Sequence, residues 1–237
     1  MQVDDVGRPL HQQPSPTINI EILPGVDLGP WRGCRKCPQP VDIGAKDGVF
    51  SPVLLTQVTG VPVGPVRDAL KVLEADNVVR VHPRSGIAFV RPSTDLVRAT
   101  YQFRTIIERA AIRQFAIAAS QSVLTQMLDE HHAAEAEVKL LDPDTNVAKR
   151  QSEIENTFHP VIVAIFRNEL VEASYRRLQL MAQIIKLEKD VYPRSAMVSV
   201  AEHIIVLSAC LARDADAADA AISQHLSNAL VRNLGVQ

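Results

Sequence analysis

Cysteine and aromatic residues are scarce in this chain of 237 residues. Three cysteines cannot form the disulfide framework that stabilises small secreted domains. Aromatic residues make up only 4% of the sequence, so Leu, Ile, Val and Ala must build the core. Hydrophobic residues still account for 46% and charged residues for 22%, a balance that excludes a wholly disordered chain. We therefore expect folded domains with aliphatic cores.

Long apolar runs are absent as well. The run at residues 161–166 has six residues, whereas a helix that spans a membrane needs about 20. The N-terminal residues MQVDDVGRPLHQQ lack the basic and then apolar pattern of a secretion signal. These observations predict a cytoplasmic protein with no membrane partner.

Proline and glycine are frequent in residues 1–50, so no long helix is expected there and the segment is poorly defined. A short element is predicted at 18–23 and a loop over 24–48. Cys34 and Cys37 form half of a zinc-ribbon signature. No second pair of ligands follows at a suitable distance, which favours two unrelated thiols over a structural zinc site.

Residues 51–92 have the pattern of a winged helix-turn-helix domain. Pro52 suits the first turn of a short helix that reaches 59, and Gly60 suits the turn after it. The apolar residues of a second helix share one face: Val66, Leu70 and Leu73. Two β runs, at 78–81 and 87–90, then flank a turn with Pro and Gly, as in a hairpin.

Such a domain places its second helix in the DNA major groove and its hairpin, or wing, near the backbone or minor groove. Residues 51–92 hold five Lys/Arg against three Asp/Glu. The basic residues placed for DNA contact are Arg67, Lys71 and Arg84. The alternative is that these three are solvated charges on a small packing module.

From residue 93 onward, every apolar pattern has the helical period. Helices are predicted at about 94–119, 122–140, 152–167, 169–189, 196–212 and 215–233. The predicted fold class is therefore mainly α. It combines an N-terminal winged helix-turn-helix, which is α with a small β-hairpin, and a C-terminal all-α helical bundle over residues 93–237.

Four residues of the predicted bundle could form a mononuclear metal site. Glu155 and His159 lie four residues apart and so share one helix face. His203 and His225 each lie on the apolar stripe of another helix. Imidazole and carboxylate ligands suit a divalent ion such as zinc, nickel or manganese.

Structural interpretations of the same residues stay open. A single histidine on an apolar face is more often a core residue than a ligand. Ser152 and Glu155 match the S-x-x-E capping box, which would give Glu155 a local role at a helix start. His131 and His132 follow two acidic residues in a polar stretch, so both are predicted to be exposed to solvent.

Both parts of the chain resemble one family. Residues 61–74, VPVGPVRDALKVLE, resemble the recognition helix VSRTPVREALRRLE of GntR-type bacterial transcription regulators. The bundle resembles the FCD ligand-binding domain of the FadR subfamily. The matching segments are Phe103-Arg104 to Glu108, Phe158-His159 with Asn168, and Glu202-His203 with Asp214 and His225.

The resemblance implies a homodimer that binds double-stranded operator DNA. It implies Glu155, His159, His203 and His225 as metal ligands, and Arg104 and Asn168 as effector-binding residues. Glu155 departs from the usual Asp. Residues 62–64, Pro-Val-Gly, replace Ser-Arg-Thr and remove an arginine. The family's first DNA-binding helix is only faintly suggested by residues 18–25.

Three functions follow as hypotheses. The first is a transcription regulator, not an enzyme, whose operator binding is controlled by a small carboxylate. A divalent ion and an inward arginine would favour such an anion. The second is a metal-dependent helical-bundle enzyme, for which no second inward carboxylate is evident as a general base. The third is a degraded regulator that lacks specific DNA binding.

Overall fold

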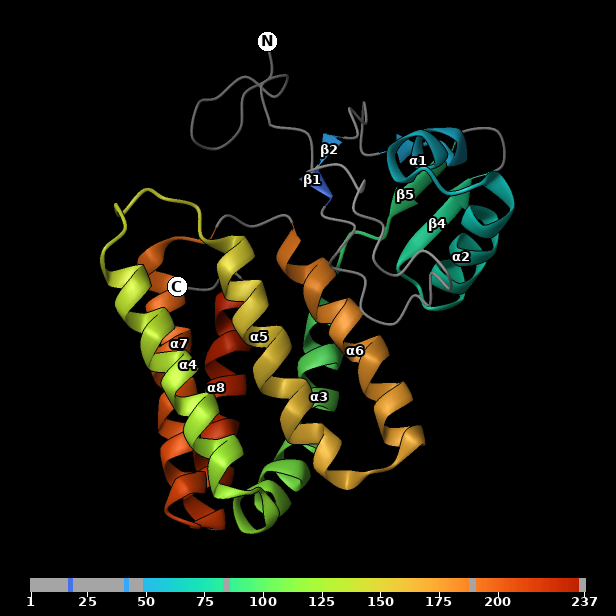
Figure 1. Ribbon diagram of the computed structural model, residues 1–237. Helices are drawn as coiled ribbons and strands as arrows, with labels where there is room; N and C mark the ends of the chain where they lie inside the picture. The colour runs from blue at the N-terminus through green and yellow to red at the C-terminus, as the bar shows by residue number, and fades with distance from the viewer. Residues whose placement is uncertain (1–16, 19–40, 43–48, 83–85, 188–190, 235–237) are drawn as a thin grey trace. The chain divides into compact units, whose positions relative to one another are not determined.

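The computed structural model describes residues 17–18, 41–42, 49–82, 86–187 and 191–234 (Figure 1). The chain divides into two compact units, residues 1–91 and 92–237. The predictions for Cys34, Cys37 and Arg84 fall outside the described residues.

Within the first fifty residues, a strand stands where the beginning of a helix was faintly suggested. Strand β1 (Thr17–Ile18) pairs with the antiparallel strand β2 (Val41–Asp42). The rest of the suggested helix, residues 19–25, lies outside the described residues.

The next elements form the predicted winged helix. They are β3 (Val49–Phe50), α1 (Pro52–Thr59), α2 (Val63–Ala75), β4 (Val79–His82) and β5 (Gly86–Phe89). The three strands make an antiparallel sheet in the order β3-β5-β4. The side chains buried in this unit include the predicted apolar face of the second helix: Val66, Leu70, Leu73, Val78, Val79 and Ile87.

Two local signals define α1. The Ser51 Oγ atom accepts a hydrogen bond from the backbone N–H of Leu54, which caps the first turn. Gly60 has a φ of 68° and ends the helix in the left-handed region, where a side chain would cause strain. Helix α2 has no side-chain cap, because its cap position is Pro62.

The second unit is the predicted all-α bundle. Its helices are α3 (Thr94–Ala118), α4 (Gln121–Lys139), α5 (Ala148–Val163), the short 3-10 helix η5 (Ala164–Phe166), α6 (Glu169–Leu187), α7 (Pro193–Leu211) and α8 (Ala215–Leu234). The mainly-α fold is confirmed. Helix α5 begins four residues before Ser152, and the Glu155 side chain bonds to other helices. The capping-box interpretation is therefore wrong.

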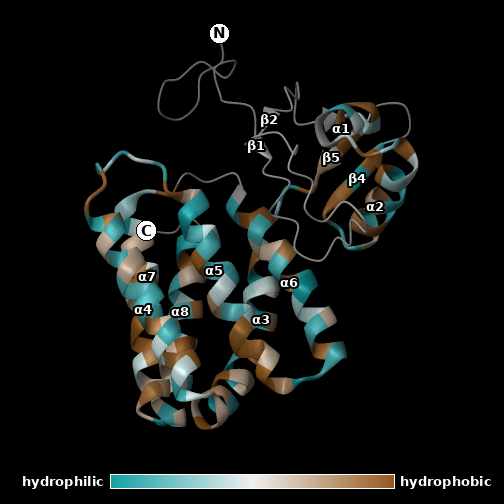
Figure 2. Ribbon diagram, in the orientation of Figure 1, coloured by the Kyte–Doolittle hydropathy of each residue, from teal (hydrophilic) through white to brown (hydrophobic). Residues whose placement is uncertain are grey.

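Helix α3 packs against α5, α6, α7 and α8, and α7 also packs against α4 and α8. Figure 2 shows hydrophilic and hydrophobic residues alternating around the bundle helices, as expected for amphipathic helices that share a core. Fully buried residues at the centre include Phe158, Leu207, Ile222 and Leu226. The polar cluster described below lies among these apolar side chains.

Helix α7 has the length and apolar composition of a helix that could cross a membrane. The longest uninterrupted apolar run did not reveal this, because average hydropathy tolerates interspersed polar residues. The core helix of a bundle meets the same criterion. Since α7 buries Ser199 and His203 and packs between α4 and α8, its composition fits a core position.

Candidate metal centre and DNA-binding surface

Four side chains from three helices converge inside the bundle. Glu155 and His159 come from α5, His203 from α7 and His225 from α8. One ligand atom from each lies within 4.8 Å of those of the other three. The three imidazoles are buried and the carboxylate is largely buried, so the predicted set of residues is brought together away from bulk solvent.

Carboxylates fix the proton positions on two of the imidazoles. The Nδ1 atom of His159 lies 2.6 Å from Oε2 of Glu108. The Nδ1 atom of His225 lies 2.7 Å from Oε2 of Glu202. Ionised carboxylates only accept hydrogen bonds, so each Nδ1 is the donor. An imidazole that carries its single proton on Nδ1 keeps a bare lone pair on Nε2.

The ionised state of both carboxylates has a physical cause. Burial by itself would raise the pKa of Glu108. The charge of Arg104 and the contact with His159 outweigh burial and hold that pKa well below its usual value. Burial would also raise the pKa of Glu202, but hydrogen bonds from His225 and Arg232 lower it to about 2.

The third imidazole of the cluster, that of His203, has its proton position set through His131. A backbone carbonyl fixes the proton on His131 itself. The Nδ1 atom of His131 lies 2.7 Å from the carbonyl oxygen of Met127, which can only accept. Burial lowers the pKa of His131 and of His203, which favours neutral rings. The Nε2 atom of His131 therefore accepts from Nδ1 of His203 at 3.2 Å, and Nε2 of His203 is also a bare lone pair.

The prediction that His131 is exposed is wrong, because only 2% of its surface is accessible. His132 is exposed, as predicted.

The donor set has the chemistry of a cation site. The Nε2 atoms of His203 and His225 face each other at 3.3 Å, although neither carries a proton to share. The Nε2 atom of His159 is buried without a hydrogen-bond partner, and it lies 3.4 Å from Oε2 of Glu155. Lone pairs on imidazole nitrogens that converge with a carboxylate repel one another unless a cation lies among them. These residues fit a divalent metal ion.

Glu155 also has partners of its own. Its Oε2 atom accepts from the ammonium of Lys186 at 2.7 Å, and Oε1 accepts from the Ser199 hydroxyl at 3.0 Å. Burial would raise the pKa of Glu155, but the Lys186 charge outweighs burial and holds the pKa well below its usual value. The extra methylene relative to Asp does not keep the carboxylate from the imidazoles, since Oε1 lies 3.9 Å from Nε2 of His203.

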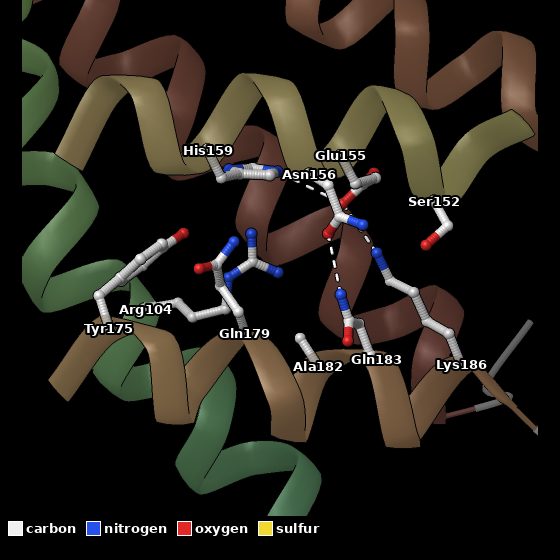
Figure 3. Close-up of a pocket in the computed structure, with 10 residues that line it drawn as sticks. All are labelled: Arg104, Ser152, Glu155, Asn156, His159, Tyr175, Gln179, Ala182, Gln183 and Lys186. Carbon is white, nitrogen blue, oxygen red and sulfur yellow. Dashed lines mark hydrogen bonds and ion pairs between the residues drawn. The ribbon is translucent and has the colours of Figure 1, made fainter. Parts of the chain in front are cut away.

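A cavity of about 30 Å³ adjoins the cluster, beside α3, α5 and α6. This is room for about two water molecules. Figure 3 shows the guanidinium of Arg104 reaching from α3 toward the residues of α5 and α6. Arg104 is 3% exposed, and its Nε donates to Oε1 of Glu108 at 2.8 Å. The hydroxyl of Tyr175 donates to the same oxygen at 2.8 Å.

Glu108 is thus a second inward carboxylate, which was not evident from the sequence. Its position four residues after Arg104 was visible in the sequence, but that spacing alone did not separate a buried pair from an exposed one.

Asn168 lies elsewhere. It is exposed, and its side-chain oxygen accepts hydrogen bonds from the backbone N–H groups of Leu170 and Val171. This contact caps the start of α6. The structure does not bring Asn168 to the cavity.

The predicted DNA-binding face of α2 is exposed. Arg67 and Lys71 both project from it, and the Lys71 ammonium pairs with Asp68 at 2.9 Å. Val63 is 43% exposed, and a Cβ atom added to Gly64 would meet nothing within 4 Å. Packing within this unit therefore does not require the apolar start of α2, which departs from the GntR pattern.

Comparison with known proteins agrees with this architecture. The sequence profile of the FCD domain matches residues 99–228. The chain belongs to the FCD domain family. The matched FCD region contains all four clustered residues as well as Glu108, His131 and Glu202. No curated protein matches the sequence. The finer assignment to the FadR subfamily stays a prediction.

Solved structures share the fold of the FCD chain at low sequence identity. A transcriptional regulator GntR from Rhodococcus sp. RHA1 is 17% identical, with a TM-score of 0.63 over 77% of this chain and 85% of that one. McbR/YncC of E. coli is 14% identical, with a TM-score of 0.67 over 78% and 86%. Lar of Listeria monocytogenes is 12% identical, with a TM-score of 0.54 over 81% and 89%.

Proposed function

We propose that this FCD protein is a cytoplasmic transcription regulator. In this proposal the winged helix binds double-stranded operator DNA, and a metal ion and a small carboxylate in the FCD domain control that binding. Membership of the FCD family and the fold shared with GntR regulators support a regulator. The observation that carries the metal site is the convergence of the His159, His203 and His225 imidazoles and the Glu155 carboxylate, whose ligand atoms lie within 4.8 Å of one another.

The metal ligands would be Glu155, His159, His203 and His225, holding zinc, nickel or manganese. A bound ion would supply positive charge and open coordination positions for an oxygen ligand. Glu108, Glu202 and His131 hold the three ligand imidazoles by their Nδ1 atoms, as outer partners do in metalloproteins.

The effector is expected to be a small organic acid. Two of the proposed metal ligands, Glu155 and His159, line the same cavity as the buried Arg104 guanidinium, so an anion that binds there could pair with the charge that a bound divalent ion would add. In calorimetric titration of metal-loaded protein, acids should bind in preference to amines and sugars. The variant Arg104→Lys keeps a charge for Glu108 but loses the planar fork, and should weaken acid binding about tenfold.

Preferential binding of a neutral sugar would contradict this assignment, as would acid binding that survives both metal removal and the Arg104 change. The cavity of about 30 Å³ adds a constraint. An acid larger than a few atoms must extend out of this volume or displace side chains that line it.

For DNA, Arg67→Ala and Lys71→Ala are each expected to weaken binding and flatten its salt dependence. Each lost phosphate contact reduces the slope of log affinity against log salt by about 0.9. Binding is measured on a duplex selected from a random library and on a duplex of unrelated sequence. Lys149→Ala, at an exposed lysine of the FCD domain, is the control with the same change in net charge.

Unchanged affinity and slope in both α2 variants would remove the DNA assignment from this surface. Failure to select any sequence from the library would favour the degraded regulator, which the apolar residues 62–64 suggest.

The proposal includes a homodimer, because winged-helix regulators read two half-sites with two copies of the domain. Native mass spectrometry of the full chain would report the oligomer and the bound metal together. No catalytic residue is assigned. Glu108, the second inward carboxylate, is held by Arg104, His159 and Tyr175 and is not free to act as a general base.

A further inference from the structure

Lys186 contacts a carboxylate of the proposed metal site. It lies in the last turn of α6, and its ammonium contacts the Glu155 carboxylate at 2.7 Å. Glu155 is one of the four clustered residues, so the Lys186 ammonium already contacts an oxygen that a metal ion would need. Figure 3 shows the Lys186 side chain extending from α6 toward Glu155 on α5, across the cavity.

The charges around the cluster show what this ammonium does. The described groups are three carboxylates and three cations, which cancel when the imidazoles are neutral: Glu108, Glu155 and Glu202, and Arg104, Lys186 and Arg232. A divalent ion would therefore leave an excess of two positive charges among these groups. Without Lys186 the excess would be one.

We propose that Lys186 sets the ligand preference of the site by opposing the metal ion and favouring an anion. This inference rests on the proposed metal and effector function. Lys186 repels a divalent ion that shares Glu155 with it, and it adds a second cation beside Arg104 to the lining of the cavity. An anion that enters the cavity can replace Glu155 as the partner of the Lys186 ammonium.

The shape of the side chain suits such an exchange. A lysine ammonium is a compact charge with three donors on a flexible stem, so it can change partners with little change in the backbone. The Lys186 side chain is 25% exposed, whereas that of Arg104 is 4% exposed and locked to Glu108. Lys186 is therefore the adaptable cation of the pair, and Arg104 is the fixed one.

A purely structural role predicts a different result. The Lys186–Glu155 pair also joins α6 to α5, and a cation in the last turn of α6 complements the helix dipole. If that were all, removing the charge would loosen the site and weaken metal and anion binding together. The proposal instead predicts changes of opposite sign.

The experiment uses the full chain with Lys186→Met, which keeps most of the stem and removes the charge. Zinc affinity is measured by competition with a chelator, and acetate affinity by calorimetry on the zinc-loaded protein. The dissociation constant for zinc should fall about tenfold and that for acetate should rise about tenfold, the scale of one hydrogen bond between charged groups.

Two further variants complete the test. Lys186→Arg keeps the charge and should stay close to the unmodified protein in both assays. Lys139→Met, which removes a lysine that is paired with Glu135 on α4, should change neither affinity. Shifts of the same sign in Lys186→Met, or no shift, would overturn the proposal for Lys186 alone. Absence of zinc binding by the unmodified protein would overturn the metal proposal and this inference with it.

Discussion

Replacing Glu108 by alanine is expected to destabilise the FCD domain by about 3–5 kcal/mol, because it leaves the buried Arg104 without its counter-charge. Arg104 and Glu108 are both almost inaccessible to solvent. The same carboxylate also accepts hydrogen bonds from His159 and Tyr175, which would lose their acceptor. Chemical denaturation of the full chain without metal, followed by helix signal, measures the change.

The chain offers a matched control for this variant. Lys139 and Glu135 form an ion pair at the same four-residue spacing on α4, but the lysine side chain is 50% exposed. Glu135→Ala should cost only about 0.5 kcal/mol. The double variant Arg104→Met/Glu108→Leu should recover much of the lost stability, since no buried charge then remains unpaired. A Glu108→Ala effect no larger than that of Glu135→Ala would contradict the buried network.

The sequence predicts the helices well because their signals are local. Ser93 and Ser120 precede α3 and α4, and each side chain accepts a hydrogen bond from the backbone three residues later. The predicted start of α5, at residue 152, is four residues too late because it too rests on a local signal. The Asn146 side-chain oxygen accepts a hydrogen bond from the N–H of Ala148 at the observed start, whereas the S-x-x-E motif at Ser152 indicates a later one.

Helical phase could have revealed His131. Its position continues the buried stripe of α4, which also contains Leu124, Met127, Ala134 and Val138. The acidic residues before it, Asp129 and Glu130, instead favour an exposed position. His132 has almost the same neighbours in sequence and is exposed, so only the phase of the helix separates the two.

Other parts of the site depend on tertiary packing and have no local signal. His131 contacts His203, which lies 72 residues away in the sequence, and His159 contacts Glu108, which lies 51 residues away. Which imidazole nitrogen carries the proton follows from these contacts, so the sequence could indicate a set of ligands but not the orientation of their lone pairs. The Lys186 contact with Glu155 was likewise invisible, since nothing in the spacing of α5 and α6 predicts it.

The largest effect on zinc binding is expected from substitution of the histidines. Three kinds of histidine variant should give large, intermediate and no loss of zinc binding. His203→Ala and His225→Ala each remove an imidazole nitrogen of the proposed metal site and should abolish the stabilisation by zinc. At zinc concentrations 100 times the dissociation constant, that stabilisation is about 2.7 kcal/mol for the unmodified protein. His131→Asn removes the partner that orients His203, and should weaken zinc binding by about 10–100-fold. His132→Ala, at an exposed position, should change nothing.

The readout is the difference in melting temperature with and without zinc, measured within each variant. A histidine lost from the core lowers stability even without metal, and this internal difference separates that cost from the loss of a ligand. If zinc raised the melting temperature of His203→Ala as much as that of His132→Ala, His203 would be a core residue and no more. A graded response can arise only if the Nε2 atoms bind the ion and the Nδ1 partners hold them in place, because removal of buried volume alone would not discriminate between zinc-loaded and zinc-free protein.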